Sequence, residues 1–318
     1  MELKGSALFV ALGGNALSPE GGTGSVPEQY RQALITMAEI VDVIEQGVGK
    51  LVVSHGNGPQ VGSILLRSEM ASKYVYPLPL DSCVAASQGG IGYTLQLALQ
   101  NRLRERHLHR PAATLVTEVI VDPDDPAFQN PTKPIGKFYA REDAIMLQRE
   151  RGWVMKEDAK RGWRQVVPSP TPLDFVETEA IEILVSAGVI VIAVGGGGIP
   201  VVRKEPDGHL EGVAAVVDKD RASALLAYKL GFDTLCILTA VSHVALDYKT
   251  PRQRPIERTT VAELQRFREA GQFAEGSMLP KIDAVIDFLE HGGKRAIITA
   301  PGHLLEALDG QTGTIVLP

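Results

Sequence analysis

Glycine-rich turns follow several apolar segments of the chain. Gly56-Asn57-Gly58 comes shortly after the buried-strand pattern of residues 51–53, and Pro59 suits a first helical position because its φ is fixed and it lacks an N–H. Gly13-Gly14-Asn15 and the glycine run 195–198 follow two other apolar segments. Backbone amides at a strand end beside a helix start can hold an anion. One such turn alone is more often ordinary, but its repetition favours a ligand site.

Three lysines are the cations that could act on a phosphate near these turns: Lys133, Lys219 and Lys281. Phosphoryl transfer needs positive charge spread around the reacting group and little covalent help. Lys219 and Lys281 are both expected at helix starts, where acidic residues are normally preferred, so each is poorly placed unless an anion binds there. For any one lysine, a solvated side chain is the simpler interpretation. Two of them at helix starts, beside glycine or acidic turns, make phosphate binding a stronger alternative to that interpretation.

The other titratable residues near these positions have competing interpretations. Asp218 is expected to cap the helix that begins near Lys219. Asp220 could hold two lysines in place or assist a magnesium ion. His55 is more often structural than basic at such a position, and a carboxylate-type acceptor oxygen is already anionic and needs no general base.

The two best-known glycine signatures of nucleotide sites do not fit this sequence. A Walker A loop requires Ser or Thr after Gly-Lys, but the Gly-Lys pairs here precede Leu51, Phe138 and Arg295. The Rossmann fingerprint requires a glycine turn that leads into a helix. The run 195–198 leads instead into Ile199 and Pro200, which continue as a strand pattern. A dinucleotide oxidoreductase is therefore a disfavoured alternative.

Apolar runs of strand length alternate with segments of helical periodicity along the chain. This pattern predicts an α/β fold, an open αβα sandwich with a mainly parallel central sheet. Such sheets bind ligands at the carboxyl ends of their strands, where the glycine turns fall. Strands are expected at 7–12, 51–53, 113–119, 189–194, 234–238, 296–299 and 314–317. Helices are expected at 27–46, 59–72, 81–106, 178–187, 218–230, 261–270 and 280–291, with Asp81 or Ser82 capping the third, and Thr260 and Glu263 forming a capping box on the sixth.

Residues 121–169 differ in texture from the rest of the chain. They contain a proline- and acid-rich stretch, the stiff segment 130–136, and Trp153 and Trp163 on either side of a charged segment. A structureless loop of this length is improbable in a compact domain. These residues are expected to form an inserted, protruding subdomain or lid with its own small hairpin, within a single domain of residues 1–318.

Composition limits the possible partners and compartment. The net charge is −6 and the chain has no basic tract, which argues against nucleic acid. No apolar run is long enough to span a bilayer. Cys83 and Cys236 lack metal or redox spacing and are expected to be reduced core residues of a cytoplasmic protein. Gly89, Gly90 and Gly92 each cost about 1 kcal/mol inside a predicted helix, which points to tight packing, a ligand or a subunit interface.

Six motifs in order carry a family resemblance that spans nearly the whole chain. They are Ala11-Leu12-Gly13-Gly14-Asn15-Ala16, the segment 54–62 (SHGNGPQVG), the segment 130–136 (NPTKPIG), the segment 195–200 (GGGGIP), Asp218-Lys219-Asp220, and the segment 276–281 (GSMLPK). Together they resemble the carbamate kinases of the amino acid kinase superfamily.

The resemblance implies the reaction ATP + carbamate ⇌ ADP + carbamoyl phosphate, run with Mg²⁺ by a homodimer that in many bacteria makes ATP at the end of arginine breakdown. Lys133 would replace a lysine that other superfamily members carry on the first strand, where Ala11 stands here. Lys219 and Lys281 would bind the transferred phosphoryl group, and Asp220 would organise them. The substrate residues would be Gly13, Gly14, Asn15, Gly56, Asn57 and Gly58. The nucleotide residues would be Gly195, Gly196, Thr239, Ala240, Ser277 and Met278.

Two further alternatives stay open on the sequence. One is a kinase of an amino acid carboxylate, similar to acetylglutamate kinase, although the missing first-strand lysine and the small Gly56–Gly58 turn argue against it. The other is a non-catalytic nucleotide sensor on the same fold. Ser242 and Asp247 depart from the usual family residues on the nucleotide side, so nucleotide contacts are less firmly implied than phosphoryl contacts.

Overall fold

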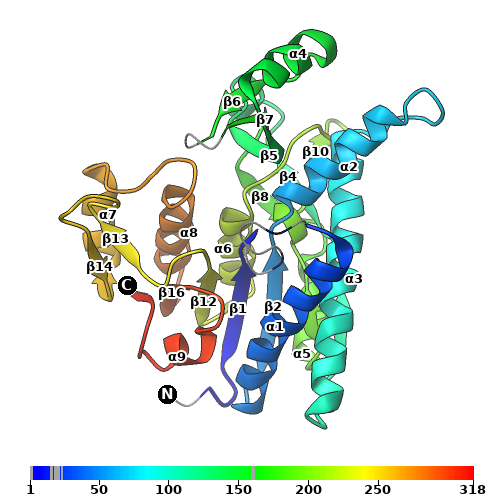
Figure 1. The fold of residues 1–318 in the computed structure, drawn as a ribbon. Helices are drawn as coiled ribbons and strands as arrows, with labels where there is room; N and C mark the ends of the chain where they lie inside the picture. The colour runs from blue at the N-terminus through cyan, green and yellow to red at the C-terminus, as the bar shows by residue number, and fades with distance from the viewer. Residues whose placement is uncertain (1–2, 15–16, 18–21, 23, 159–161) are drawn as a thin grey trace.

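The main sheet forms the centre of the molecule in the computed structural model, which describes residues 3–14, 17, 22, 24–158 and 162–318. Within this part of the chain it has eight strands, in the order β15-β17-β16-β12-β1-β2-β9-β3 (Figure 1). Neighbouring strands are parallel except β16 and β17. The strands are β1 (Ala7–Leu12), β2 (Lys50–His55), β3 (Ala112–Thr114), β9 (Ile190–Ile192), β12 (Thr234–Leu238), β15 (Arg258–Thr260), β16 (Arg295–Thr299) and β17 (Thr314–Leu317).

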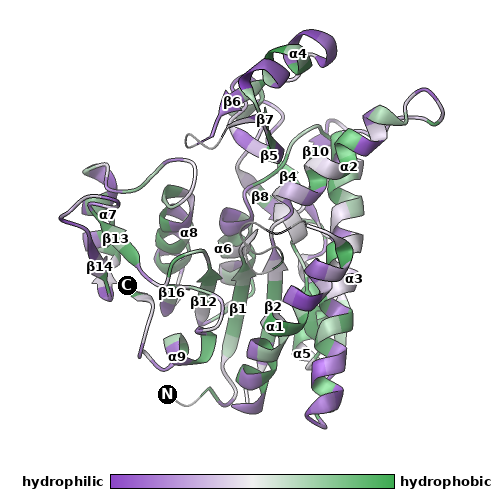
Figure 2. Cartoon of the chain, viewed as in Figure 1, coloured by the Kyte–Doolittle hydropathy of each residue, from purple (hydrophilic) through white to green (hydrophobic). Residues whose placement is uncertain are grey.

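Helices cover both faces of this sheet because its central strands are apolar on both sides. Phe9 and Ala11 of β1 belong to one buried cluster, while Leu8, Val10 and Leu12 belong to another. Figure 2 shows the central strands as hydrophobic and the projecting helix α4 as largely hydrophilic. The predicted αβα sandwich is confirmed. The first cluster includes residues of α5 (Thr178–Ser186), α6 (Lys219–Lys229), α7 (Val261–Glu269) and α8 (Leu279–Glu290), and the second includes residues of α1 (Val26–Glu45), α3 (Leu80–Glu105) and α9 (Leu304–Leu308).

The carboxyl ends of the central strands lie together at one edge of the sheet. Strand β1 lies between β2, the next strand in the chain, and β12, which comes much later. The order in which the strands follow along the sheet therefore reverses at β1. The amide of Gly13 donates to the carbonyl of Leu238 at 2.9 Å, and the amide of Gly56 donates to the carbonyl of Leu12 at 3.1 Å. A crevice at such a reversal of strand order is where open α/β sheets bind ligands.

The prediction of a single strand at 113–119 is wrong, because the chain changes sheets there. Strand β3 ends at Thr114, and Glu118 begins β4 in a second sheet. Between them, the amide of Thr117 donates to the side chain of Gln88, while its carbonyl accepts both from Gln88 and from the amide of Ile199, so its backbone bonds leave the main sheet and join the second one. The second sheet has the order β11-β10-β4-β8, with β4 (Glu118–Val121), β8 (Pro172–Phe175), β10 (Ile199–Lys204) and β11 (His209–Gly212).

The two predicted helix caps have different outcomes. Helix α3 begins at Leu80 with Pro79 as its N-cap residue, so neither Asp81 nor Ser82 caps it. Pro79 is extended and the N-cap position lies two or three residues earlier than predicted, which leaves Asp81 in the first turn, where an acid favours the helix dipole. The capping box of Thr260 and Glu263 on α7 is confirmed.

Three strands and one helix among the described residues 133–158 and 162–167 project from the rest of the chain (Figure 1). The strands have the order β5-β7-β6 and are antiparallel, so the predicted hairpin is part of a three-stranded arrangement. Ile135 and Val167 pack into a buried cluster with Val61, which fixes the base of this subdomain to the main body. Farther out, Glu69 accepts from Trp153. The elements are β5 (Lys133–Tyr139), α4 (Arg141–Arg151), β6 (Met155–Glu157) and β7 (Trp163–Val167).

Helix α2 (Gly58–Met70) and strand β5 touch backbone to backbone. A Cβ on Gly62 would lie 2.2 Å from the Cα of Gly136, closer than real Cβ contacts occur. Gly136 has a φ of +69°, and its carbonyl accepts from Nη2 of Arg164 at 3.0 Å. The contact therefore requires glycine at position 62, and it sets how the subdomain meets the helix that follows the Gly56–Gly58 turn.

Substitution of Gly62 by Ala is expected to separate α2 from β5, because the added methyl group would meet backbone that cannot give way. Hydrogen exchange of the β5 and β7 amides should become at least about tenfold faster, the effect of losing roughly 1.4 kcal/mol of local stability. Gly276→Ala, in the turn before α8, is the control, since a Cβ there meets no described atom within 4 Å. The control should leave exchange of the β5 and β7 amides unchanged. Equal exchange rates in the two variants would contradict this account.

Candidate active site

The start of helix α6 provides the first part of the site. Asp218 is its N-cap residue, and Oδ1 accepts from the amides of Asp220 at 2.9 Å and Arg221 at 3.3 Å. The predicted cap is thus confirmed. Ser223 on the next turn lies 2.7 Å from the hydroxyl of Ser54 on β2, and it donates to the carbonyl of Lys219. These bonds tie the first turn of α6 to the end of β2.

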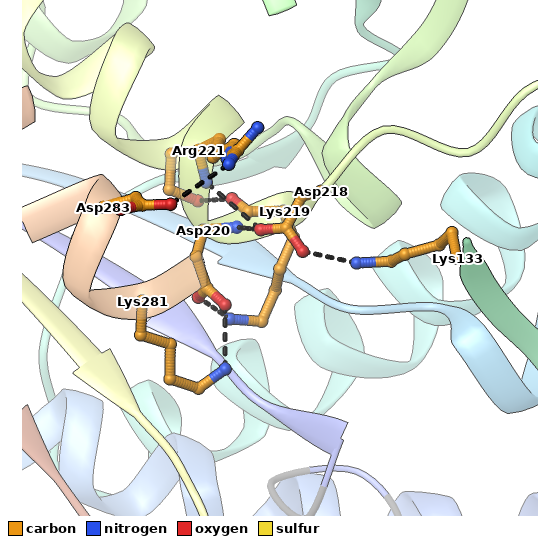
Figure 3. A network of polar contacts seen from close by, with 8 residues as sticks. Lys133, Asp218, Lys219, Asp220, Arg221, Lys281 and Asp283 are labelled. Atoms are coloured by element: carbon orange, nitrogen blue, oxygen red, sulfur yellow. Dashed lines mark hydrogen bonds and ion pairs between the residues drawn. The ribbon is translucent and has the colours of Figure 1, made fainter. Parts of the chain in front are cut away.

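Asp220 joins the two lysines that lie in first turns of helices. Its Oδ1 accepts from Nζ of Lys219, and its Oδ2 accepts from Nζ of Lys281 in α8 at 2.9 Å (Figure 3). Asp220 is 2% exposed and Lys219 is 8% exposed. A buried carboxylate needs such partners, since an uncompensated one would be strongly destabilising.

Burial and these ion pairs together shift the pKa values of all three groups. Burial alone would raise the pKa of Asp220, but the ammonium groups of Lys219 and Lys281 outweigh burial and hold that pKa below its usual value. Burial lowers the pKa of Lys219 despite its bond to Asp220. Burial also opposes the charged form of Lys281, yet Asp220 and Asp218 raise its pKa. Asp220 is therefore ionised at neutral pH.

Lys133 reaches the same place from the projecting subdomain. Its Nζ lies 2.5 Å from Oδ2 of Asp218, and Figure 3 shows it approaching α6 from the side opposite Lys281. The three lysines predicted from the sequence thus meet around two carboxylates, although they come from three distant parts of the chain. The three ammonium groups and the two carboxylates together carry a formal charge of +1.

The turn glycines border this group of charges. A Cβ on Gly56 would lie 3.6 Å from Cδ of Lys219, and one on Gly58 would lie 3.8 Å from the carbonyl oxygen of Pro134 in β5. Gly13 is buried against β12, and Gly14 is exposed. Asn15, which the sequence also assigned to the substrate, lies outside the described residues.

In the Gly56–Gly58 turn, the side chain of Asn57 points into the protein. Nδ2 of Asn57 donates to the hydroxyl of Ser87 on α3 at 2.9 Å, and a Cβ on Gly196 would strike the same amide. Gly195 lies against His55 and accepts from Gln88 at 3.0 Å. Gly195 and Gly196 therefore contact the Gly56–Gly58 side of the site, and a nucleotide role for them stays a prediction.

Residues predicted for the nucleotide lie on the other side of β1. Thr239 and Ala240 follow β12, and the amide of Thr239 donates to the carbonyl of Thr299 on β16. Ser277 and Met278 directly precede α8, whose first turn carries Lys281. The charged group lies between these residues and the Gly56–Gly58 turn.

Gln88 is a structural contributor that the sequence reasoning missed. Its amide bonds to both backbone groups of Thr117 and to the carbonyl of Gly195, next to Val194, a β-branched residue strained at a φ of +56°. The available signal was its position: Val84, Gln88 and Ile91 lie on one face of the predicted helix, so a polar residue falls on the apolar stripe.

His55 is buried and its Nδ1 lies 3.0 Å from the carbonyl of Gly56. Burial lowers its pKa to about 4, and nearby Lys219 acts in the same direction. The imidazole is therefore neutral at neutral pH, in agreement with the structural interpretation.

Two further observations on the described part of the chain concern metal ions and membranes. They contain no group of three or more His, Cys, Asp or Glu side chains arranged to hold a metal ion. None of the helices in this part of the chain combines the length and the apolar character needed to cross a membrane.

The chain is similar to known proteins over nearly its whole length. A carbamate kinase of Pyrococcus furiosus is 49% identical over 317 residues, which cover 99% of this chain and 100% of the relative. One from Pyrococcus horikoshii is 48% identical over 98% of this chain and 99% of its own length. Carbamate kinase from Giardia lamblia bound to citric acid has a TM-score of 0.94 at 39% identity, and the same protein bound to AMP-PNP has 0.90 at 40%, each over 99% of both chains. The profile of the amino acid kinase family matches residues 7–300, and the chain therefore belongs to the amino acid kinase family.

Proposed function

We propose that this protein is a carbamate kinase that catalyses ATP + carbamate ⇌ ADP + carbamoyl phosphate. The observation that carries the proposal is the meeting of Lys133, Lys219 and Lys281 at the carboxyl edge of the sheet. Relatives named carbamate kinase match the chain over nearly its whole length, which supports this acceptor over an acetylglutamate-type substrate. The first strand offers the buried Ala11 rather than a lysine, so the third ammonium group comes from the subdomain.

We place carbamate at the Gly56–Gly58 turn and the nucleotide beside Thr239, Ala240, Ser277 and Met278. The phosphoryl group would then pass over the end of β1, past Gly13 and Gly14, with Lys219 and Lys281 on its oxygens. At about 4 Å and a moderate effective dielectric, one ammonium–phosphate contact is worth on the order of 4 kcal/mol. Asp220 keeps the two ammonium groups together, so the charge is arranged before the transition state forms.

No general base is required for this transfer, because the attacking carbamate oxygen is already anionic. The residue that could be mistaken for a base, His55, is buried and neutral, and its ring lies against Gly195. We propose that His55 supports the glycine run 195–198 structurally, by packing against Gly195.

We propose that Mg²⁺ enters with the nucleotide. Both carboxylates of the site, Asp218 and Asp220, already accept from lysine ammonium groups, which makes them a poor donor set for a protein-held ion. Mg²⁺ in phosphoryl-transfer sites is commonly held largely by substrate phosphates and water. When bound there, it would neutralise charge on the phosphates that the lysines do not reach.

We propose a homodimer that uses the outer face of α3. Gly92 is explained within the subunit, since a Cβ there would strike Thr114. Gly89 and Gly90 are exposed, with no described atom within 4 Å of an added Cβ, and Tyr93 beside them is largely exposed. A helix surface without side chains allows close approach of a second copy.

We also propose that the protein works in the cytoplasm, in arginine catabolism. The two buried free cysteines are in keeping with that compartment.

The direct test is ATP formation. Protein, Mg²⁺, ADP and carbamoyl phosphate are mixed, and ATP is measured by luciferase luminescence. We expect ATP to appear in proportion to protein, and no ATP when carbamoyl phosphate is replaced by acetylglutamyl phosphate. Nucleotide binding without any ATP formation would instead support a sensor.

Removal of either paired lysine should slow the reaction severely. Lys219→Ala and Lys281→Ala are each expected to lose at least about 100-fold in kcat, the scale for deleting one preorganised electrostatic group. Lys294→Ala is the control, because Lys294 is 76% exposed in a surface pair with Asp233, and its rate should stay within about twofold. Near-normal turnover in either site variant would refute its role.

The buried neutral His55 predicts a specific loss of stability in mild acid. The unfolded chain binds a proton at this residue below a pKa of about 6.5, whereas the folded protein does so only near 4. Stability should therefore fall with decreasing pH, by about 2 kcal/mol from this residue between pH 7.5 and pH 5. Urea unfolding of His55→Asn should lack this part of the decline. Carboxylates with lowered pKa values, such as Asp220, lose their contribution only below about pH 4. Parallel declines in the two proteins would contradict the assignment.

A further inference from the structure

The two carboxylates at the start of α6 divide the three lysines between them. Asp220 uses both oxygens on Lys219 and Lys281. Asp218 uses Oδ1 on the helix amides and Oδ2 on Lys133. Helix capping therefore accounts for only one of its two oxygens.

The second oxygen of Asp218 has a partner that capping does not require. Lys133 lies 85 positions earlier in the chain, on the first strand of the projecting subdomain, where its backbone is paired with Val167 of β7. The strand fixes where the lysine begins, but a long side chain with four rotatable bonds can point in many directions. Its side chain is 27% exposed, so packing alone does not hold it. The contact to Asp218 is what directs it toward α6.

The neighbouring positive charges keep the carboxylate of Asp218 ionised. Burial on its own would raise the pKa of Asp218, but the ammonium group of Lys133, and then those of Lys281 and Lys219, hold it well below its usual range. Asp218 is thus a permanent anion at the point where the subdomain meets the main body.

We propose that Asp218 is a positioning residue that orients Lys133 for the transferred phosphoryl group, as a counterpart to Asp220. This inference rests on the proposed function. A lysine ammonium group has three donors. Since Asp218 takes one of them, two remain for phosphoryl oxygens, and Lys133 can act without leaving its partner.

The deciding variant is Asp218→Asn. Asparagine caps helices about as well as aspartate but presents no charge to Lys133. We expect kcat for ATP formation to fall at least about tenfold, the scale for losing a hydrogen bond to a charged group. Thermal melting should stay close to that of the unmodified protein because the cap remains. Asp218→Ala, which removes cap and charge together, should show the same rate loss with a lower melting temperature.

A double-mutant cycle separates positioning from a general effect on the site. In protein that already carries Lys133→Ala, adding Asp218→Asn should change kcat by less than about twofold, because the group that Asp218 orients is gone. Equal losses in both backgrounds would overturn the proposal. So would a normal rate for Asp218→Asn with a slow Asp218→Ala, since Asp218 would then act only as a cap.

A second measurement does not depend on catalysis. Amine acetylation of the substrate-free protein, read by mass spectrometry, should modify Lys133 at least about threefold faster in Asp218→Asn, because the amine loses its charged hydrogen-bond partner. Lys294 serves as the internal reference. If the unmodified protein makes no ATP but Lys133 becomes more reactive, the function fails and the Asp218–Lys133 contact stands. Unchanged reactivity of Lys133 would overturn the contact itself.

Discussion

The buried carboxylate of Asp220 is the interaction on which the site depends. Two ammonium groups placed close together repel each other, and burial makes each of them costlier. A carboxylate between them offsets both effects and leaves donors free on each lysine. Because Lys219 and Lys281 lie in the first turns of two different helices, this one contact also fixes how α6 and α8 approach each other. Structure and charge are therefore inseparable at this point.

The parallel sheet explains why residues so distant in sequence meet. Parallel strands end at the same edge, and β1 places the turns of its two neighbours on either side of itself. The turn after β2 and the residues after β12 are thus held a short way apart, with the start of α6 between them. A phosphoryl group that moves between two substrates needs this kind of separation, since both must face it in line.

Much of this arrangement could be predicted because local signals agree with the fold. Alternating strand and helix patterns gave the layers, and the Thr260–Glu263 capping box was readable three residues apart. Lys219 and Lys281 stood out because lysine is unusual in a first helical turn. Lys133 was a candidate cation from the sequence as well, and the family resemblance added its role, because nothing in its own neighbourhood marks it as a partner of α6.

The misses share a physical origin in contacts between distant residues. The strand expected at 113–119 divides because the chain passes there from the main sheet to the second sheet, with Thr117 bonded to Gln88 on α3 and to Ile199. No local propensity reveals those distant partners. The start of α3 moved to Leu80 because an extended proline leads into the helix, where the polar Asp81 and Ser82 gave the stronger capping signal. The pairing of Lys133 with Asp218 is likewise invisible until the subdomain is placed in space.

The glycine contact between α2 and β5 has a mechanical consequence. Helix α2 begins immediately at the turn proposed to receive carbamate, and Gly62 on its second turn abuts Gly136, three residues beyond Lys133. A movement of the subdomain at this contact would therefore also move α2. Such a movement would change the Gly56–Gly58 turn and the position of Lys133 together, so access of carbamate to the turn and removal of Lys133 from the site would be coupled.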